Sequence, residues 1–212
     1  MKHLPGFILI FLVVTGASRF PADKSSRFNS ASDSLKIQLQ VKYDSLNLLD
    51  SYSAHISTPV CEGSKCYTIE INFHWDLIGR FQHFDTLSGK GLTKLDHIPF
   101  TREDYRKLEA ILKNPLSRLA AYSNEELVKE TRSSAIDGIT GATNVELKAS
   151  VIEGAVYSCH TLWHIAHGPM VLDLQSVTQQ FFSQELVQKL VSSEDQSINY
   201  FLINRFSARD FT

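Results

Sequence analysis

Residues 35–87 carry the alternation of apolar and polar positions that is typical of β-strands. The clearest segment is 67–75, whose apolar positions are Tyr67, Ile69, Ile71, Phe73 and Trp75. Such a strand buries one face and leaves the other to solvent or to a cleft. The same alternation marks residues 35–43, and residues 54–60 and 80–86 are weaker strand candidates. Together these segments predict an antiparallel sheet over about residues 35–87.

Helical periodicity takes over after this sheet. A helix is expected to begin after Thr101, a residue type that caps helices, and to end before Pro115. A short helical turn is expected over 116–122, followed by a capping box from Ser123 to Glu126. The strongest helix is expected over 145–167, where one apolar stripe contains Ile152, Val156, Cys159, Trp163 and Ala166. Gly168 and Pro169 should end it, and helices are then expected over 184–191 and 196–206.

This order of elements predicts an α+β fold, with an antiparallel sheet in the N-terminal half, packed helices after it and a helical C-terminal tail. The length suits one domain with an appendage. We expect the α+β domain to span residues 35–170 and the helical tail to span residues 171–212.

The N-terminus has the features of a secretory signal peptide. Lys2 and His3 give a basic start, residues 7–14 are apolar, and small residues end at Ala17. The apolar run is shorter than the ~20 residues that cross a bilayer. We expect cleavage near Ala17, export to the periplasm or the extracellular space, and no membrane span afterwards. An uncleaved membrane anchor is the alternative. Residues 18–34 are polar and predict a mobile leader.

Three cysteines fit an oxidising compartment. Cys61 and Cys66 enclose a four-residue turn between two predicted strands, so a disulfide across this hairpin is expected. A free pair or a metal-binding pair is the alternative. Cys159 lies alone on a predicted helix and is expected to be a buried, unreactive thiol.

Charge and motifs exclude several classes of function. The formal net charge is -2, which gives no reason to expect nucleic acid or an anionic membrane as a partner. The sequence contains no Walker loop, dinucleotide-binding glycine fingerprint or nucleophile elbow.

Three histidines lie on one side of the predicted helix over 145–167. His160, His164 and His167 are spaced four and three residues apart, so they form a narrow stripe. Two histidines one turn apart can share a metal ion, but the sequence identifies no further ligand. The other interpretation is that all three hold ordinary positions, with His167 favourably placed at the helix C-terminus.

The segment from Asp137 to Thr143 has the features of a phosphate site. Gly138 and Gly141 permit backbone angles that other residues avoid. The residues that follow Gly141 fit a capping box that would place Thr143 at the start of a helix, where N–H groups and the helix dipole favour a phosphate. The same residues also fit a turn in which Thr143 does no more than cap the helix.

The run Asp137-Gly138-Ile139-Thr140-Gly141-Ala142-Thr143 resembles the flavin-attachment motif of FMN-binding domains, Asp-x-x-Ser/Thr-Gly-Ala-Thr. These domains occur in the FMN-carrying subunits of sodium-translocating NADH:quinone reductases and of Rnf-type electron-transfer complexes. The resemblance covers residues 137–143 and the helix expected after them. It implies that Thr143 carries FMN through a phosphoester bond and that Asp137 belongs to the signal read by an FMN transferase. Thr140, Gly141 and Ala142 complete the cofactor-binding residues that the resemblance implies.

The resemblance has gaps outside this run. The glycine-rich upstream segment and the Glu-Thr-Pro-Gly-like segment that are usual in FMN-binding domains are absent from the sequence. Asn144 and Val145 follow Thr143, where the family often has another Ser or Thr. Trp163 and Tyr157 are candidates to stack on a flavin, although core packing is the commoner role of such residues.

The sequence therefore predicts an exported carrier of covalent FMN that takes part in electron transfer with a redox partner the sequence does not identify. The flavin would supply the chemistry, and the protein would supply its attachment and surroundings. Whether the protein is an enzyme is left open. Two alternatives remain: an exported binding or structural module without a cofactor, and a metal-binding protein that uses the histidine stripe.

Overall fold

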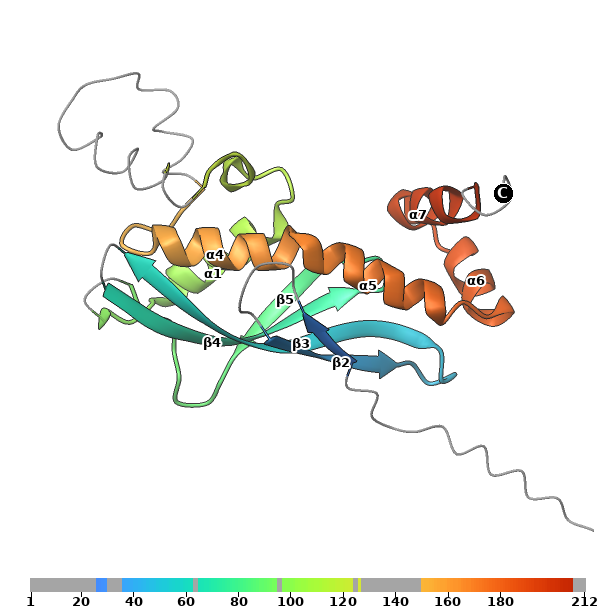
Figure 1. Ribbon diagram of the computed structural model, residues 1–212, viewed down its shortest axis with the longest axis horizontal. Helices are drawn as coiled ribbons and strands as arrows, with labels where there is room; N and C mark the ends of the chain where they lie inside the picture. Colours follow the sequence, from blue (N-terminus) through green and yellow to red (C-terminus); the bar gives the residue numbers. More distant parts are fainter. Residues whose placement is uncertain are drawn as a thin grey trace, which may run out of the picture.

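The described strands form one antiparallel meander. This computed structural model describes residues 26–29, 36–62, 65–94, 97–123, 126 and 150–207. Within them, the sheet has the order β1-β2-β3-β4-β5, and its long central strands are plain in Figure 1. The strands are β1 (Ser26–Asn29), β2 (Lys36–Tyr43), β3 (Leu49–Glu62), β4 (Lys65–Asp76) and β5 (Phe81–Thr86).

The alternation in the sequence decides which face of the sheet is buried. In β3 and β4, Ala54 faces Phe73 and Ile56 faces Ile71 across the ladder, and all four side chains are buried. The intervening residues of β4, such as Asn72 and His74, point to the opposite, outer face and are partly exposed. The predicted antiparallel sheet is therefore confirmed, and β3 is longer than the weak candidate segment 54–60.

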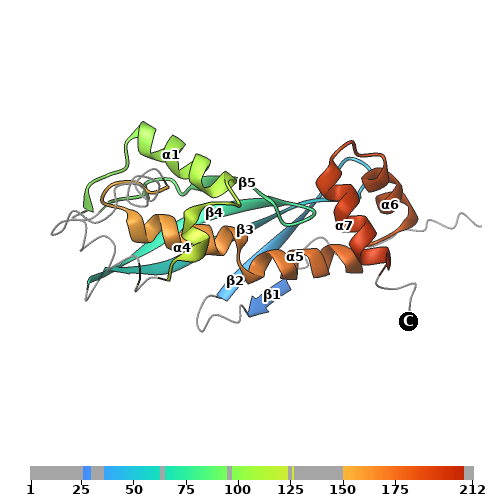
Figure 2. The same cartoon turned by 90° about the horizontal axis from the view of Figure 1, so that it is seen from above.

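Helices cover the buried face of the sheet. They are α1 (Arg102–Lys113), α4 (Val156–His167) and α5 (Pro169–Gln180). The short 3₁₀ helix η2 (Arg118–Ala121) lies against α4. Helices α4 and α5 follow one another along the sheet in both views (Figures 1 and 2). The indole of Trp75 on β4 donates a 3.1 Å hydrogen bond to the carbonyl of Ala166. The α+β fold class is thus confirmed.

The C-terminal pair of helices lies at one end of the molecule, away from the start of α4 (Figure 1). Helix α6 (Gln184–Val191) and helix α7 (Gln196–Ser207) match the predicted ranges closely. Lys189 of α6 pairs with Asp44 after β2 at 2.7 Å, and Arg80 before β5 pairs with Asp195 at 2.6 Å. These ion pairs join the tail to the turns of the sheet.

The break between α4 and α5 lies where the sequence predicts it. The N–H of Gly168 donates to the carbonyl of His164, and a Cβ atom at Gly168 would overlap that same carbonyl oxygen. Pro169, which needs no N–H partner at a helix start, begins α5. Helix α5 therefore spans the expected boundary between residues 170 and 171, and the side chain of its Gln175 bonds to the carbonyl of Ile78.

The expected helix over 145–167 is wrong over its described N-terminal part. Residues 150–155 form turns, and the helix begins at Val156. The cause is Gly154, whose φ of +74° is incompatible with a right-handed helix. Ile152 therefore lies before α4 rather than within it, and Thr143 does not cap the helix that contains Cys159 and Trp163.

The polar segment 18–34 also differs from the expectation of a mobile leader. Its residues 26–29 form β1, which pairs antiparallel with β2 so that Phe28 faces Ile37. The predicted signal peptide, residues 1–17, lies outside the described residues. Within the described ranges, no helix is both long enough and apolar enough to span a bilayer.

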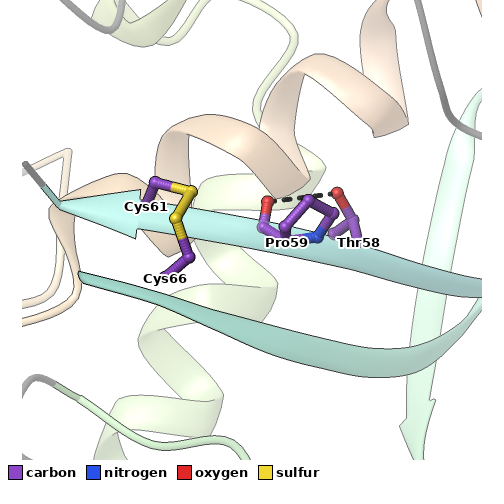
Figure 3. The surroundings of a disulfide bond; sticks show 4 residues. All are labelled: Thr58, Pro59, Cys61 and Cys66. Atoms are coloured by element: carbon purple, nitrogen blue, oxygen red, sulfur yellow. Dashed lines mark hydrogen bonds between the residues drawn. A yellow bond between two sulfur atoms is a disulfide. The ribbon is translucent and has the colours of Figure 1, made fainter. Parts of the chain in front are cut away.

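The predicted cysteine pairing is present at the tip of the β3–β4 hairpin. Cys61 and Cys66 face each other in the ladder and form a disulfide with an S–S distance of 2.07 Å (Figure 3). Cys159 is a free thiol with no exposed surface. A disulfide is compatible with a secreted protein.

Candidate functional site

The residues of the flavin-like motif lie outside the described part of the chain. This applies to Asp137, Thr140, Gly141, Ala142 and Thr143. The structure does describe the two ends between which the motif is held, Glu126 on one side and Ser150 on the other. The candidate site is therefore defined by what surrounds these two ends.

The first end is fixed by a capping box that the sequence predicts. The hydroxyl of Ser123 accepts a hydrogen bond from the N–H of Glu126 at 3.2 Å, and the Glu126 carboxylate accepts one from the N–H of Ser123 at 2.8 Å. Just before it, the carbonyl of Tyr122 accepts a 2.8 Å hydrogen bond from His160 of α4. The residue that follows η2, Tyr122, thus lies against the first turns of α4.

The second end returns to the same part of α4. Ile152 is buried, and its N–H points at the sulfur of Cys159, 3.4 Å away. Gly154 packs closely on Lys94, because a Cβ atom built at Gly154 would lie 3.4 Å from the Cβ of Lys94. The described residues on either side of 127–149 therefore both meet the N-terminal half of α4.

The tip of the β3–β4 hairpin reaches this end of α4 as well. The hydroxyl of Tyr67, next to the disulfide-bonded Cys66, lies 2.7 Å from the hydroxyl of Ser158. In Figure 3 the disulfide lies at the tip of the hairpin, in front of helical ribbon. A covalent cross-link and a hydrogen bond together fix the sheet beside α4 at this end.

A hollow of about 380 Å³ opens beside Tyr67. Its walls come from β4 and from the loop that leads to α1, and they include Tyr67, Glu70, Lys90, Leu92, Thr93 and His97. Lys90 pairs with Glu70 at 2.6 Å. The hollow has the volume of a small-molecule site, which ranges over about 300–1,000 Å³.

The histidine stripe joins α4 to the segment formed by α1 and η2. The Nε2 atoms of His160, His164 and His167 lie 2.8, 3.1 and 2.7 Å from the carbonyl oxygens of Tyr122, Leu119 and Leu112, respectively. A carbonyl oxygen can only accept, so each ring must donate from Nε2. These three nitrogens are therefore engaged in backbone hydrogen bonds and are not free to bind a metal ion.

Burial sets the protonation of two of these rings. Loss of solvent lowers the pKa of His160 and of His167 below the ordinary value, and the neighbouring His164 lowers both further. Both rings are therefore held in the neutral form. Among the described residues, Nδ1 of His160 is buried without a hydrogen-bond partner.

The two candidate stacking residues belong to the core. Trp163 is 5% exposed, donates from its indole N–H to the carbonyl of Asn114 at 2.9 Å, and packs against His164 and His167. Tyr157 is 9% exposed. Neither side chain presents a free ring face of the size that a flavin needs.

A group that the sequence analysis missed lies on the outer face of the sheet. His74 of β4 stands opposite His83 of β5, and Asp85 follows two residues later on the same strand. His74 Nε2 lies 2.8 Å from Asp85 Oδ2, and the two imidazole rings stack with their centroids 4.1 Å apart. The signal that could have found this group is the spacing of His83 and Asp85, which places them on one face of a strand.

Comparison with known proteins does not assign a function to this site. No protein-family model matches the chain, and no match was found among curated proteins or solved structures.

Proposed function

We propose that this protein is an exported carrier of FMN, bound covalently through a phosphoester to the hydroxyl of Thr143, and that it takes part in electron transfer outside the cytoplasm. The observation that carries the proposal is the run from Asp137 to Thr143, which fills every defined position of the flavin-attachment motif. The isoalloxazine ring would supply the redox chemistry, and the chain would supply the anchor and the surroundings of the ring.

The ends of the motif-bearing segment support this proposal. Ser123 and Glu126 fix one end by their reciprocal hydrogen bonds, and the buried Ile152 fixes the other. A flavinylated segment has to reach an FMN transferase during maturation and a redox partner afterwards. Tyr122 and Ile152, which flank this segment, both contact α4, so its two ends are anchored beside the same helix.

Chain length limits where the flavin would lie. Seven peptide units join Thr143 to Ser150, so their Cα atoms are at most about 25 Å apart. The hollow beside Tyr67 belongs to the same end of the molecule, since Tyr67 bonds to Ser158 of α4. It is a candidate surface for the ring system, in place of the buried Trp163 and Tyr157.

Export is part of the same proposal. The signal-like residues 1–17 predict it, and the Cys61–Cys66 disulfide is compatible with an oxidising compartment. The proposed partners are an FMN transferase, which attaches the cofactor, and a redox partner that exchanges electrons with it.

The test is flavinylation of the full chain in a host that exports it and carries an FMN transferase. Intact-mass measurement should show the added mass of FMN less water, and the flavin absorbance should remain with the protein after denaturation. Thr143→Ala should abolish the addition, Asp137→Ala should reduce it, and Thr140→Ser should be tolerated because the motif accepts either hydroxyl there.

Thr161→Ala is the matched control, since it removes a threonine hydroxyl from α4 and should leave the labelling unchanged. Unlabelled wild-type protein beside a labelled positive control would reject the flavin proposal. The binding-module function would then take its place. The observation that favours this second function is α7, whose Tyr200 and Ile203 are 69% and 63% exposed.

A further inference from the structure

The outer face of the sheet holds a set of side chains with the chemistry of a metal site. His74, His83 and Asp85 can each offer one ligand atom, and these three atoms lie within 4.8 Å of one another. They converge because His74 and His83 are direct partners in the β4–β5 ladder and Asp85 is two residues further along β5. Two imidazoles and one carboxylate are a common protein ligand set for Zn²⁺ and similar ions.

The geometry points to a site for a divalent transition-metal ion, bound by His74 Nε2, a ring nitrogen of His83 and a carboxylate oxygen of Asp85. Bonds of about 2.0–2.2 Å in a tetrahedral arrangement place two ligand atoms about 3.3 Å apart. His74 Nε2 and Asp85 Oδ2 are already 2.8 Å apart. The ligand atom of His83 lies within 4.8 Å of the other two, and the side chains of His83 and Asp85 are exposed, which leaves them room to rotate toward an ion.

A hydrogen bond between His74 and Asp85 does not by itself explain the arrangement of all three residues. The ring of His83 lies almost parallel to that of His74, at 7°. Among the described residues, none forms a hydrogen bond with the imidazole of His83, so its nitrogens are open to a ligand. A metal ion would give these nitrogens a partner.

Lys42 of β2 determines which tautomer His74 adopts. Its ammonium group lies 3.3 Å from Nδ1 of His74. An ammonium group can only donate, so Nδ1 accepts and the ring proton is on Nε2, from which it is donated to Asp85. A metal ion on Nε2 would displace that proton to Nδ1, and Lys42 would then have to move away. Lys42 is exposed and free to do so.

This role of Lys42 predicts a variant that binds metal more tightly. In Lys42→Gln the positive charge is removed, and the new amide oxygen can accept from the protonated Nδ1 of His74. Ligand histidines in proteins commonly have such an acceptor on their second nitrogen, and its loss costs about 10–100-fold in metal affinity. Lys42→Gln should therefore raise the affinity several-fold, whereas zinc bound adventitiously elsewhere on the surface would show no such dependence.

The experiment is calorimetric titration of the full, tag-free chain with Zn²⁺ alone. Wild-type protein should bind one ion in the micromolar range, and His83→Asn and Asp85→Asn should each weaken binding more than tenfold. His55→Asn is the matched control, because His55 lies exposed on the same face and pairs with Asn72 instead. Its affinity should equal that of the wild type.

Circular dichroism of each variant separates loss of a ligand from loss of fold. His83 and Asp85 lie on the edge strand β5, where substitution should leave the spectrum unchanged. Wild-type affinity in folded His83→Asn, or no zinc binding by the wild type, would overturn the assignment. The titration uses protein without flavin, so its outcome is independent of the FMN proposal.

Discussion

The hydroxyl of Tyr52 lies 2.6 Å from the hydroxyl of Thr178 and joins β3 to α5 in the buried core. The Thr178 hydroxyl donates its single proton to the carbonyl of Leu77, at 2.5 Å. Tyr52 must therefore donate to Thr178. Because burial raises the pKa of Tyr52 to about 12, the phenol keeps this proton throughout the physiological range.

This order of donation predicts unequal costs for two conservative substitutions. Tyr52→Phe leaves the bond from Thr178 to Leu77 in place and should lower the free energy of unfolding by about 1 kcal/mol. Thr178→Val should cost roughly 2–4 kcal/mol, because it leaves both a buried phenol and a buried carbonyl without partners. Urea unfolding measures both.

Tyr200→Phe is the control for this pair, since Tyr200 is 69% exposed and should change the free energy of unfolding by less than about 0.5 kcal/mol. Equal losses for Tyr52→Phe and Thr178→Val would contradict the proposed direction of donation.

A second prediction concerns the stability of the protein in mild acid. Burial lowers the pKa values of His160 and His167 below the unfolded value of 6.5, so the unfolded chain binds protons more readily than the folded one. The contribution of these two neutral histidines to the free energy of unfolding is present above pH 6.5 and is lost as the pH falls through their folded pKa values. Unfolding midpoints measured across this range should fall with the pH.

His160→Gln provides the comparison. Its amide group can still donate to the carbonyl of Tyr122 but does not titrate, so the acid-induced loss of stability should become shallower even if the variant is less stable at neutral pH. An unchanged slope would show that the acid sensitivity arises elsewhere.

The cysteines give a third prediction. Native protein should not react with a thiol reagent, because Cys159 is fully buried and burial raises the pKa of its thiol to about 12. Denaturation should expose one thiol, and reduction under denaturing conditions should expose all three cysteines. Three reactive thiols in denatured, unreduced protein would show that Cys61 and Cys66 are not joined.

A fourth prediction compares two glycines that share a left-handed backbone. Gly79 and Gly89 have φ values of +81° and +76°. A Cβ atom at Gly79 would lie 3.0 Å from Cγ1 and 3.1 Å from the carbonyl oxygen of Val171, whereas one at Gly89 would meet nothing within 4 Å. Both alanine variants carry the backbone strain of about 1–2 kcal/mol.

Gly79→Ala should therefore destabilise more than Gly89→Ala, since it also pushes the start of α5 away from the β4–β5 turn. Thermal unfolding of the two variants isolates this difference. If their midpoints coincide, the contact with Val171 does not limit how closely α5 approaches the sheet.

Local signals were sufficient to predict much of this fold. Strand β4 follows from its strict alternation, which ends in Trp75, and α6 occupies the range 184–191 that the sequence predicts. These patterns depend on neighbours close in sequence. Strands β2 to β5, helices α6 and α7 and the Cys61–Cys66 disulfide accordingly lie where the sequence predicts them, whereas α5 is not among the expected helices.

Other features depend on contacts that no local pattern contains. The apolar stripe with Ile152 favours a helix, yet Gly154 adopts a left-handed turn in which Ile152 still becomes buried. Strand β1 has a polar sequence and exists because it pairs with β2. The convergence of His74 and His83 needs the register of the sheet. The flavin motif remains a prediction, since its residues lie outside the described ranges.

The hydrogen bonds from the α4 histidines to the backbone of α1, η2 and Tyr122 have a consequence for which positions of the sequence can change during evolution. The acceptors are backbone carbonyl oxygens, which every amino acid possesses, and the donors are the imidazoles of His160, His164 and His167. A substitution at Tyr122 or Leu112 can alter packing but leaves the acceptor itself in place, whereas loss of one imidazole removes the donor. Homologues should therefore retain the three histidines, whereas the residues that supply the carbonyl acceptors should differ from one homologue to another.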